Sequence, residues 1–527
     1  MSWKSASSRA IDALPTNRSF YDRPVKHTYD VVVVGAGSAG ATLASRLSED
    51  TSRTVALVEA GPDYPEMSAL PEGLRHGRAS ATLQLDLGIH DWSFVGRATD
   101  ARPEMSVPRG RVTGGTSAVN GQIWLRGMPE DYEGWNDPRW RWSDVLGSFR
   151  SSEDDPELAQ ELHGRGGPIR VRRFPREEWV ACARAFADAC DGLGYAELRD
   201  FNDPEGEGFG AYTMNNPDGI RLSTAIAYLG PSRSRPNLSI LPETLAHRVV
   251  FDGLCATGVE VEDATGAVST IRGREIVLSA GAVGSPHLLM LSGVGPREQL
   301  EAAGVRVIRD LPGVGKNLQD HPIVYLAWKV REGNELSRED PIVQVALRYR
   351  SGGSPDRNDM WLTPCTIADL FLIVPGVYLP RSRGELSLVS ADVRVQPRLD
   401  YRYLGDPRDR ERLVEGIRLG LRVAGTAPLR DLLGDRLTPA DTDLADDAAL
   451  DEWVDRSVET SHHIACTCAM GPADDRHSVV DGEGRVHGVE RLRVVDASIM
   501  PSIPRANTNA STIMVAERIA ALMRDGA

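Results

Sequence analysis

The chain has 527 residues, of which 41% are hydrophobic and 26% are charged, a composition typical of a folded soluble protein. Its 60 basic and 75 acidic side chains give a net charge of −15, which argues against a nucleic-acid-binding protein. No stretch approaches the roughly 20 apolar residues of a membrane helix, so we expect no membrane insertion. Residues 1–27 form an N-terminal extension without a signal-like apolar core, and the six cysteines are sparse and irregular. These features predict a cytoplasmic protein with reduced thiols.

The first clear element combines a strand, a glycine turn, a helix and a second strand. The β-branched run that ends at Val34 is typical of a buried parallel strand. Gly35, Gly37 and Gly40 then match G-x-G-x-x-G, which permits a tight turn, close approach of a pyrophosphate and close helix packing. Glu59 ends the second strand, where a carboxylate can accept hydrogen bonds from a ribose. The pattern predicts a bound dinucleotide, with a ligand-free turn as the alternative, and does not separate FAD from NAD.

Strand, small-residue turn and helix patterns return later in the chain, at residues 274–295 and at 491–525. We therefore expect both ends of the chain to build one domain. The middle of the chain has a different pattern and predicts a second domain. A loop-rich segment is interpreted as a lid or a meander. The predicted boundaries are 28–155, 215–325 and 456–527 for the discontinuous nucleotide domain, 156–214 and 326–455 for the second domain, and 65–107 for the loop region.

Several motifs in chain order resemble the glucose–methanol–choline (GMC) family of FAD-dependent alcohol oxidoreductases. They are "GRVTGGTSAVNGQIWLRG" from residue 110, "GAVGSPHLLMLSGVG" from residue 281, "HHIACTCAMG" from residue 462 and "RVVDASIMPSIPRANTNAST" from residue 493. The resemblance implies FAD rather than NAD. It also implies an α/β fold with α+β elements, in which a Rossmann-type FAD-binding domain is interleaved with a sheet-and-helix substrate-binding domain.

The resemblance implies a set of flavin contacts along these motifs. Some relatives tether FAD through a histidine at the position of Val119, and valine cannot form that bond, so we predict non-covalent FAD. Arg109 and Arg126 either neutralise phosphate or are solvated surface residues, and Trp92 is expected in the core. The implied cofactor-binding residues are Gly35, Gly37, Ser38, Ala39, Gly40, Glu59, Ala60, Gly114, Gly115, Ser117, Asn120, Gly121, Val249, Asp496, Ala497 and Thr508.

The same resemblance implies a catalytic pair. The family's catalytic histidine falls on His463, and its second active-site residue falls on Asn507. A neutral histidine is a suitable base for a hydroxyl proton, and an amide can hydrogen-bond to the developing alkoxide. Alternatively, Asn507 only caps the helix that follows it.

Two residues of this block depart from the family pattern. His462 stands where many relatives have an aromatic residue, and it either binds a polar substrate or only shapes the loop. Cys466 stands where many relatives have glycine, and it either narrows the site or alters the turn. His462, His463, Cys466 and Cys468 could all ligate zinc, but no second cluster accompanies them, so we predict no metal.

The predicted function is oxidation of a small-molecule alcohol to the carbonyl compound, with hydride transfer to FAD and with O2 or another electron acceptor. One alternative is a flavin-containing lyase of the same fold that cleaves cyanohydrins. Another is a flavin protein that only transfers electrons. The alcohol, the acceptor and the oligomeric state are not encoded in these motifs.

Overall fold

The computed structural model describes residues 28–77, 87–158, 161–335 and 340–525. The predicted N-terminal extension, and residues 78–86 of the predicted loop region, lie outside these ranges. None of the helices in the described ranges has the length and apolar character needed to cross a membrane.

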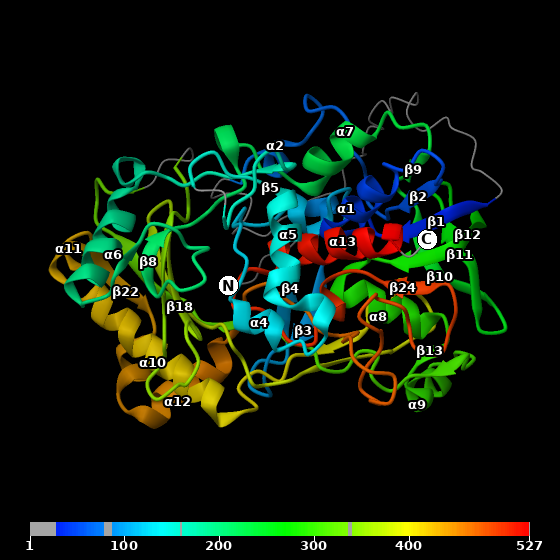
Figure 1. Ribbon diagram of the computed structural model, residues 1–527. Coiled ribbons are helices and arrows are strands. Elements are labelled where there is room, and N and C mark those ends of the chain that lie inside the picture. Colours follow the sequence, from blue (N-terminus) through cyan, green and yellow to red (C-terminus); the bar gives the residue numbers. More distant parts are fainter. Residues whose placement is uncertain (1–27, 78–86, 159–160, 336–339, 526–527) are drawn as a thin grey trace.

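The first sheet is the nucleotide-binding sheet that the sequence predicts, and it lies on the right in Figure 1. Strands β24, β12, β1, β2 and β9 run parallel in that order. Strand β11 pairs antiparallel with the first half of β12, and β10 pairs antiparallel with β11. Five of the six residues of β1 are buried, as the β-branched run predicts. The bounds are β1 Tyr29–Val34, β2 Val55–Val58, β9 Leu238–Leu241, β10 Leu245–Asp252, β11 Cys255–Glu262, β12 Val268–Leu278 and β24 Leu492–Val494.

Helices from both ends of the chain pack beside this sheet. The last helix, α13, lies beside α1 and α5, and Figure 1 shows the red C-terminal helix next to the blue N-terminal elements. Arg46 of α1 donates hydrogen bonds to Glu517 of α13, which joins residues 471 positions apart. Elements from the two ends of the chain therefore pack against each other beside the same sheet. The bounds are α1 Ser38–Leu47, α5 Trp142–Ser152, α8 Gly281–Leu291 and α13 Thr508–Asp525.

The second sheet lies on the left in Figure 1 and is largely antiparallel. Its strand order is β22-β16-β19-β18-β17-β8-β7, with β15 paired to β19 and β23 paired to β15. The strands are β7 Glu197–Leu198, β8 Gly208–Ala211, β15 Pro322–Ile323, β16 Leu326–Val330, β17 Val345–Tyr349, β18 Met360–Ile367, β19 Leu370–Val377, β22 Leu433–Thr438 and β23 Glu459–Thr460. Helices α6 Ala181–Gly192, α10 Pro407–Ala424, α11 Ala427–Arg430 and α12 Asp447–Ser457 accompany it. This is the sheet-and-helix unit expected for substrate binding.

Part of the predicted loop region forms a small sheet rather than a free loop. Strands β3 (Phe94–Arg97) and β4 (Met105–Val107) pair with each other, and β3 also pairs with β21 (Arg398–Asp400), which pairs with β20 (Glu385–Ser387). The remaining short elements are α2 Glu72–Arg75, α4 Pro129–Glu133, α7 Gly230–Ser232, α9 Arg297–Ala302, β5 Glu153–Asp154, β6 Ile169–Arg170, β13 Val294–Gly295 and β14 Arg309–Asp310.

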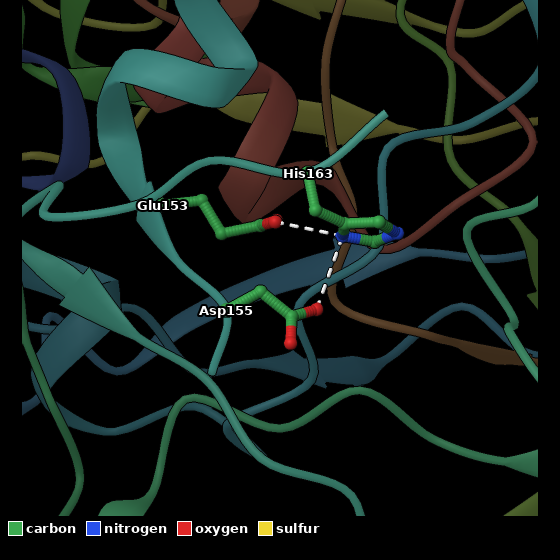
Figure 2. Close-up of side chains that lie close together, drawn as sticks. All are labelled: Glu153, Asp155 and His163. Carbon is green, nitrogen blue, oxygen red and sulfur yellow. Dashed lines mark hydrogen bonds and ion pairs between the residues drawn. The ribbon is translucent and has the colours of Figure 1, made fainter. Parts of the chain in front are cut away.

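A buried group of charges lies where the chain crosses between the two units. His163 Nδ1 lies 2.8 Å from Glu153 Oε1 and 3.0 Å from Asp155 Oδ2, as Figure 2 shows, and its Nε2 lies 2.8 Å from Asp200 Oδ2. Burial alone would lower the pKa of His163, but hydrogen bonds to Asp155, Asp200 and Glu153 outweigh burial and raise that pKa to about 10. His163 is therefore an imidazolium at neutral pH.

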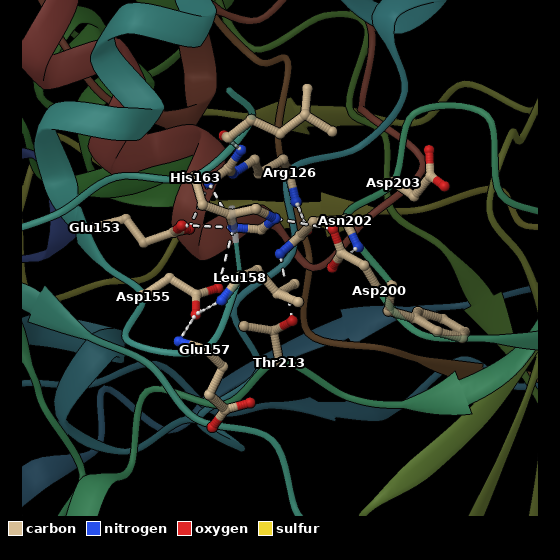
Figure 3. Close-up of polar contacts among 12 residues, drawn as sticks. Arg126, Glu153, Asp155, Glu157, Leu158, His163, Asp200, Asn202, Asp203 and Thr213 are labelled. Atoms are coloured by element: carbon tan, nitrogen blue, oxygen red, sulfur yellow. Dashed lines mark hydrogen bonds and ion pairs between the residues drawn. The ribbon is translucent and has the colours of Figure 1, made fainter. Parts of the chain in front are cut away.

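Two arginines complete this group. Arg126, labelled in Figure 3, lies 2.6 Å from Glu153. Arg173 lies 2.9 Å from Asp155. The two guanidinium groups and the His163 imidazolium thus balance three carboxylates. Glu153, Asp155 and His163 have the spacing of metal ligands, but each ring nitrogen already faces a carboxylate and the charges cancel. The cluster is a buried ion-pair network that joins residues 153–163 to Asp200. Arg126 pairs with Glu153 in this network and is not directed at a phosphate site.

Candidate active site

One cavity of about 1360 Å³ runs from the glycine turn of the nucleotide sheet to the face of the second sheet. The predicted cofactor-binding residues and the predicted catalytic and substrate-binding residues both line this cavity, although they come from distant parts of the sequence. The predicted residues along its wall are Gly35, Gly37, Ser38, Ala39, Glu59, Ala60, Gly115, Asn120, Gly121, His462, His463, Asp496, Ala497, Asn507 and Thr508.

The glycines at its floor have the distinct roles that the motif predicts. Gly35 has a φ of +99°, and a Cβ there would lie 2.5 Å from the carbonyl oxygen of Ser279. A Cβ on Gly40 would lie 1.8 Å from the carbonyl oxygen of Gly35, so α1 could not pack this close with any larger residue. Gly37, by contrast, opens onto the cavity, and among the described residues only Gly115 lies within 4 Å of a Cβ built there. Bare backbone therefore meets the cavity where a pyrophosphate would lie.

Glu59 lies at the end of β2 and is fixed by backbone groups. Its two oxygens accept hydrogen bonds from the N–H groups of Ala36 (2.9 Å) and Gly61 (2.8 Å). Burial raises its pKa to about 7, against the opposing effect of these hydrogen bonds. Each carboxylate oxygen has a further lone pair, so Glu59 can still accept from a ribose diol on its cavity side.

Four predicted cofactor residues lie behind the cavity wall. Gly40 serves helix packing, and Gly114, with a φ of +99°, donates its N–H to the carbonyl of Ala36 (2.7 Å). Ser117 accepts from the N–H of Thr224 (3.0 Å) and donates to the carbonyl of Gly114 (2.6 Å). These three residues shape the turn segments that do line the cavity.

Val249 is the fourth of these residues. Its N–H donates to Ser292 Oγ (2.8 Å), and Leu245 and Ala246 are the β10 residues that line the cavity. The register of β10 shifts between Ala246 and Arg248, which changes the backbone groups that face inward.

His463 and Asn507 meet at the other end of the cavity. The Asn507 side-chain Nδ2 lies 2.9 Å from His463 Nε2 and donates to it. His463 Nδ1 lies 2.9 Å from both Ser461 Oγ and His321 Nδ1. Because Nε2 accepts this hydrogen bond, the His463 ring carries its proton on Nδ1. Nε2 is therefore the basic nitrogen.

The environment of His463 keeps it neutral. Burial lowers its pKa well below the ordinary value, and His321, His462 and Arg109 lower it further. A neutral imidazole can accept a proton at neutral pH, so the geometry and the protonation state both suit a general base.

Comparison with known proteins agrees with this arrangement. The GMC oxidoreductase family models match residues 29–323 and 380–516. The chain belongs to the GMC oxidoreductase family. It is 34% identical to the oxygen-dependent choline dehydrogenase of Vibrio vulnificus, over 94% of each chain. It is 35% identical to the glucose dehydrogenase [FAD, quinone] of Drosophila melanogaster, over 94% of this chain and 87% of the relative. The crystal structure of pyridoxine 4-oxidase from Mesorbium loti has a TM-score of 0.87 and 30% identity, over 94% of this chain and 99% of that one.

Membership of the GMC family makes this chain an FAD-dependent oxidoreductase and confirms the predicted fold class. The cavity fits the cofactor at both ends. Gly37 leaves backbone exposed at the turn, while Asn507 Oδ1 and Asn509 Nδ2 are buried polar atoms on the wall without a hydrogen-bond partner among the described residues. Such atoms require a partner, and the polar edge of a flavin can supply one.

Sequence reasoning did not identify Asp320, which fixes the backbone of His321 and His463. Asp320 is fully buried and accepts from the N–H groups of His321 (2.8 Å) and His463 (2.9 Å). It also accepts from Tyr403 Oη (2.8 Å) and from the Thr460 hydroxyl. This one carboxylate therefore fixes the backbone of both histidines. The only local signal was the pair Asp-His in "NLQDHP", which by itself does not indicate a contact with residue 463.

His462 and Cys466 both adopt left-handed backbone conformations in the GMC histidine loop, with φ of +66° and +74°. His462 lines the cavity, and its carbonyl accepts from Arg109 Nη1 (2.7 Å), so Arg109 supports the loop. Burial and the Arg109 charge lower the pKa of His462 to about 3. Cys466 is buried away from the cavity and keeps the turn that glycine would adopt without strain. Trp92, which we expected in the core, lines the cavity.

Proposed function

We propose that this GMC oxidoreductase oxidises an alcohol to the carbonyl compound, with His463 as the base. The observation that carries the proposal is the contact between His463 Nε2 and Asn507 Nδ2, 2.9 Å apart on the wall of the cavity that also contains the glycine turn. A base and a hydrogen-bond donor directed at one point suit removal of a hydroxyl proton.

The side chains divide the work as follows. The substrate hydroxyl donates to His463 Nε2, which takes its proton as the carbonyl forms. Asn507 turns its N–H from the imidazole to the substrate oxygen, where negative charge develops. The His463 Nδ1–H faces Ser461 and His321, whose acceptor atoms stabilise the positive charge that the imidazole gains. FAD, when bound, supplies the acceptor for the hydride that leaves the carbinol carbon.

FAD is proposed to bind without a covalent bond at residue 119. Val119 lines the cavity beside Asn120 and Gly121, and an isopropyl group has no nucleophilic atom. We propose Glu59 for the ribose, the turn at Gly35–Gly37 for the pyrophosphate and Asp496–Thr508 for the flavin end. We propose Ala246, rather than Val249, for the backbone contact to adenine. The cytoplasmic location and the choice of O2 or another acceptor stay predictions.

Anaerobic mixing with an alcohol panel tests the proposal. Bleaching of the oxidised flavin absorbance, with one equivalent of aldehyde or ketone formed for each flavin, is the expected result. Release of cyanide from a cyanohydrin without bleaching would instead support the lyase alternative, and no change with any alcohol would contradict alcohol oxidation. Because the pKa of His463 is lowered from its ordinary value, the rate of bleaching should fall only below about pH 6.5.

A further inference from the structure

His287, on helix α8, is a buried imidazole that the proposed chemistry leaves without a role. It lies on the wall of the cofactor cavity and is 7% exposed. Its Nε2 is buried and has no hydrogen-bond partner among the described residues. Burial lowers the pKa of His287 to about 4, so at neutral pH the ring is neutral and offers one N–H donor and one acceptor nitrogen. Because buried polar atoms are nearly always paired, this ring requires a partner from the cavity.

Helix α8 carries His287 away from the flavin end of the cavity. Gly281, at the start of the helix, donates its N–H to Asp496 Oδ2 (2.9 Å), and Asp496 belongs to the segment proposed for the flavin. His287 lies two turns further along the helix, about 9 Å from Gly281 at the α-helical rise. Gly284, His287 and Leu288 all line the cavity, and they share one face of the helix because they are three and four positions apart. That face therefore continues along the cavity beyond the flavin end.

The far end of α8 is attached to the strand proposed for adenine. Ser292, directly after the helix, accepts from the N–H of Val249 in β10 (2.8 Å), and Figure 1 shows α8 beside β10. Leu245, at the start of β10, lines the cavity. The preceding residue, Thr244, donates its N–H to the carbonyl of Glu59 (2.8 Å), the residue proposed for the ribose. Helix α8 and strand β10 are therefore two walls of the adenosine half of the cavity.

The groups at this end of the cavity suit an adenine ring. Ala246 of β10 and Leu288 of α8 are buried apolar residues on the two walls. Glu262, at the end of the neighbouring strand β11, also lines the cavity but forms an ion pair with Arg394 (2.5 Å). Adenine has flat faces and an edge that carries an amino donor and ring-nitrogen acceptors. The neutral imidazole of His287 can pair with either kind of atom on that edge.

We propose that His287 binds the edge of the FAD adenine by a hydrogen bond and thereby adds to the preference of this cavity for FAD over FMN, which has no adenine. The proposal rests on the proposed placement of FAD and names a side chain for its adenine end, where the family motifs implied only the backbone of Val249. The imidazole N–H donates to a ring nitrogen of adenine, or its bare nitrogen accepts from the amino group. Either bond gives the buried ring its missing partner.

The rate of FAD release from the diluted holoenzyme, measured by separating bound from free flavin on a desalting column, tests the proposal. We expect FAD to dissociate about 10- to 100-fold faster from His287→Leu than from the wild type, because leucine leaves the adenine edge buried and unpaired. His287→Gln keeps a donor and an acceptor and should stay within about fivefold of the wild type. Equal rates in the wild type and His287→Leu would overturn the proposal.

Met290→Leu is the matched control for a change inside the same helix. Met290 is fully buried in α8 and is not among the described residues of the cavity wall. We expect it to release FAD at the wild-type rate. Thermal unfolding of each holoenzyme shows whether the variants are folded. Release from Met290→Leu that is as fast as release from His287→Leu would overturn a specific contact at His287.

Displacement of bound FAD by ADP or by FMN identifies the half of FAD that His287 contacts. Loss of an adenine contact in His287→Leu weakens the binding of FAD and ADP alike but leaves the binding of FMN unchanged. We therefore expect the FMN concentration that displaces half of the FAD to fall about tenfold or more, while the corresponding ADP concentration stays the same.

Two other outcomes of this displacement would overturn the proposal. A fall in the ADP concentration alone would place His287 at the flavin half. Faster FAD release with neither concentration changed would mean that the substitution only loosens the fold. No alcohol takes part in these measurements, so a failure of the adenine contact and a failure of the proposed alcohol oxidation are separate results.

Discussion

The glycine turn and the histidine loop are the two functional regions of this molecule, and they are built differently. The turn at Gly35–Gly40 is encoded by one short motif, in which Gly35 has positive φ and Gly40 packs on the Gly35 carbonyl, although Gly35 also packs against Ser279 from a distant segment. The loop at residues 461–471 supplies His463, but its partner Asn507 and its supports Asp320 and His321 come from distant segments. A cofactor site can therefore be recognised from one short motif, whereas a catalytic site of this kind requires the folded chain.

Gly35→Ala should have the largest effect, because it disrupts the glycine turn at Gly35–Gly40. The added Cβ would lie 2.5 Å from a backbone carbonyl, at a φ that L residues avoid. We expect purified protein with little or no FAD and hence no flavin-dependent activity, measured by absorbance after desalting. Gly253→Ala is a control, because Gly253 also has positive φ, at +61°, but open space at its Cβ. Full FAD occupancy in Gly35→Ala would contradict the assigned role of this turn.

The difference between the regions explains what could be predicted from the sequence. His463 and Asn507 were found through a family resemblance, and the structure brings them into contact. His321 lies 142 positions from His463, and no local pattern indicates that separation. The adenine contact at Val249 was predicted from the family pattern; in the structure the Val249 N–H bonds to Ser292 Oγ, and Leu245 and Ala246 of the same strand line the cavity. Residues 94–107 were interpreted as loop because their partner β21 is about 300 residues away.

His321→Phe should have the next largest effect, because it removes a contact between the histidine loop and a distant segment of the chain. Phenylalanine preserves a ring beside Tyr378 but removes one of the two partners of His463 Nδ1, while Ser461 remains. We expect FAD to be retained and anaerobic reduction by the best alcohol to slow by about 10- to 100-fold. Since His321 lowers the pKa of His463, the acid limb of the rate profile should also move upward toward pH 6.5. An unchanged profile with a slower rate would indicate only structural damage.

The buried His163 network lies outside both functional regions and should affect the stability of the fold. The folded-state pKa of His163 is about 10, above its ordinary value of 6.5. Its contribution to the free energy of unfolding is therefore fully present below pH 6.5 and is lost as pH rises to about 10. We expect the midpoint of urea unfolding to fall over this range in the wild type and to fall less in His163→Gln. Parallel pH dependence in the two proteins would contradict a buried imidazolium.

Substitutions at Cys466 should have the smallest effect, a change in stability that arises within the histidine loop. At a φ of +74°, glycine is unstrained and alanine is not. We expect Cys466→Gly to be more stable than Cys466→Ala by about 1 kcal/mol, although glycine is the smaller residue. Cys468, which is also fully buried, should give the opposite order. Thermal unfolding of the four variants checks this, and the same order at both positions would argue against backbone strain.

The central claim is that His463, and not its neighbour His462, takes the proton from the alcohol. The direct measurement is the rate constant of anaerobic flavin reduction in His463→Ala and His462→Phe, with FAD occupancy matched. We expect a loss of about 10²- to 10⁴-fold for His463→Ala and a loss below tenfold for His462→Phe. A near-normal rate in His463→Ala, or a complete loss confined to His462→Phe, would contradict the assignment.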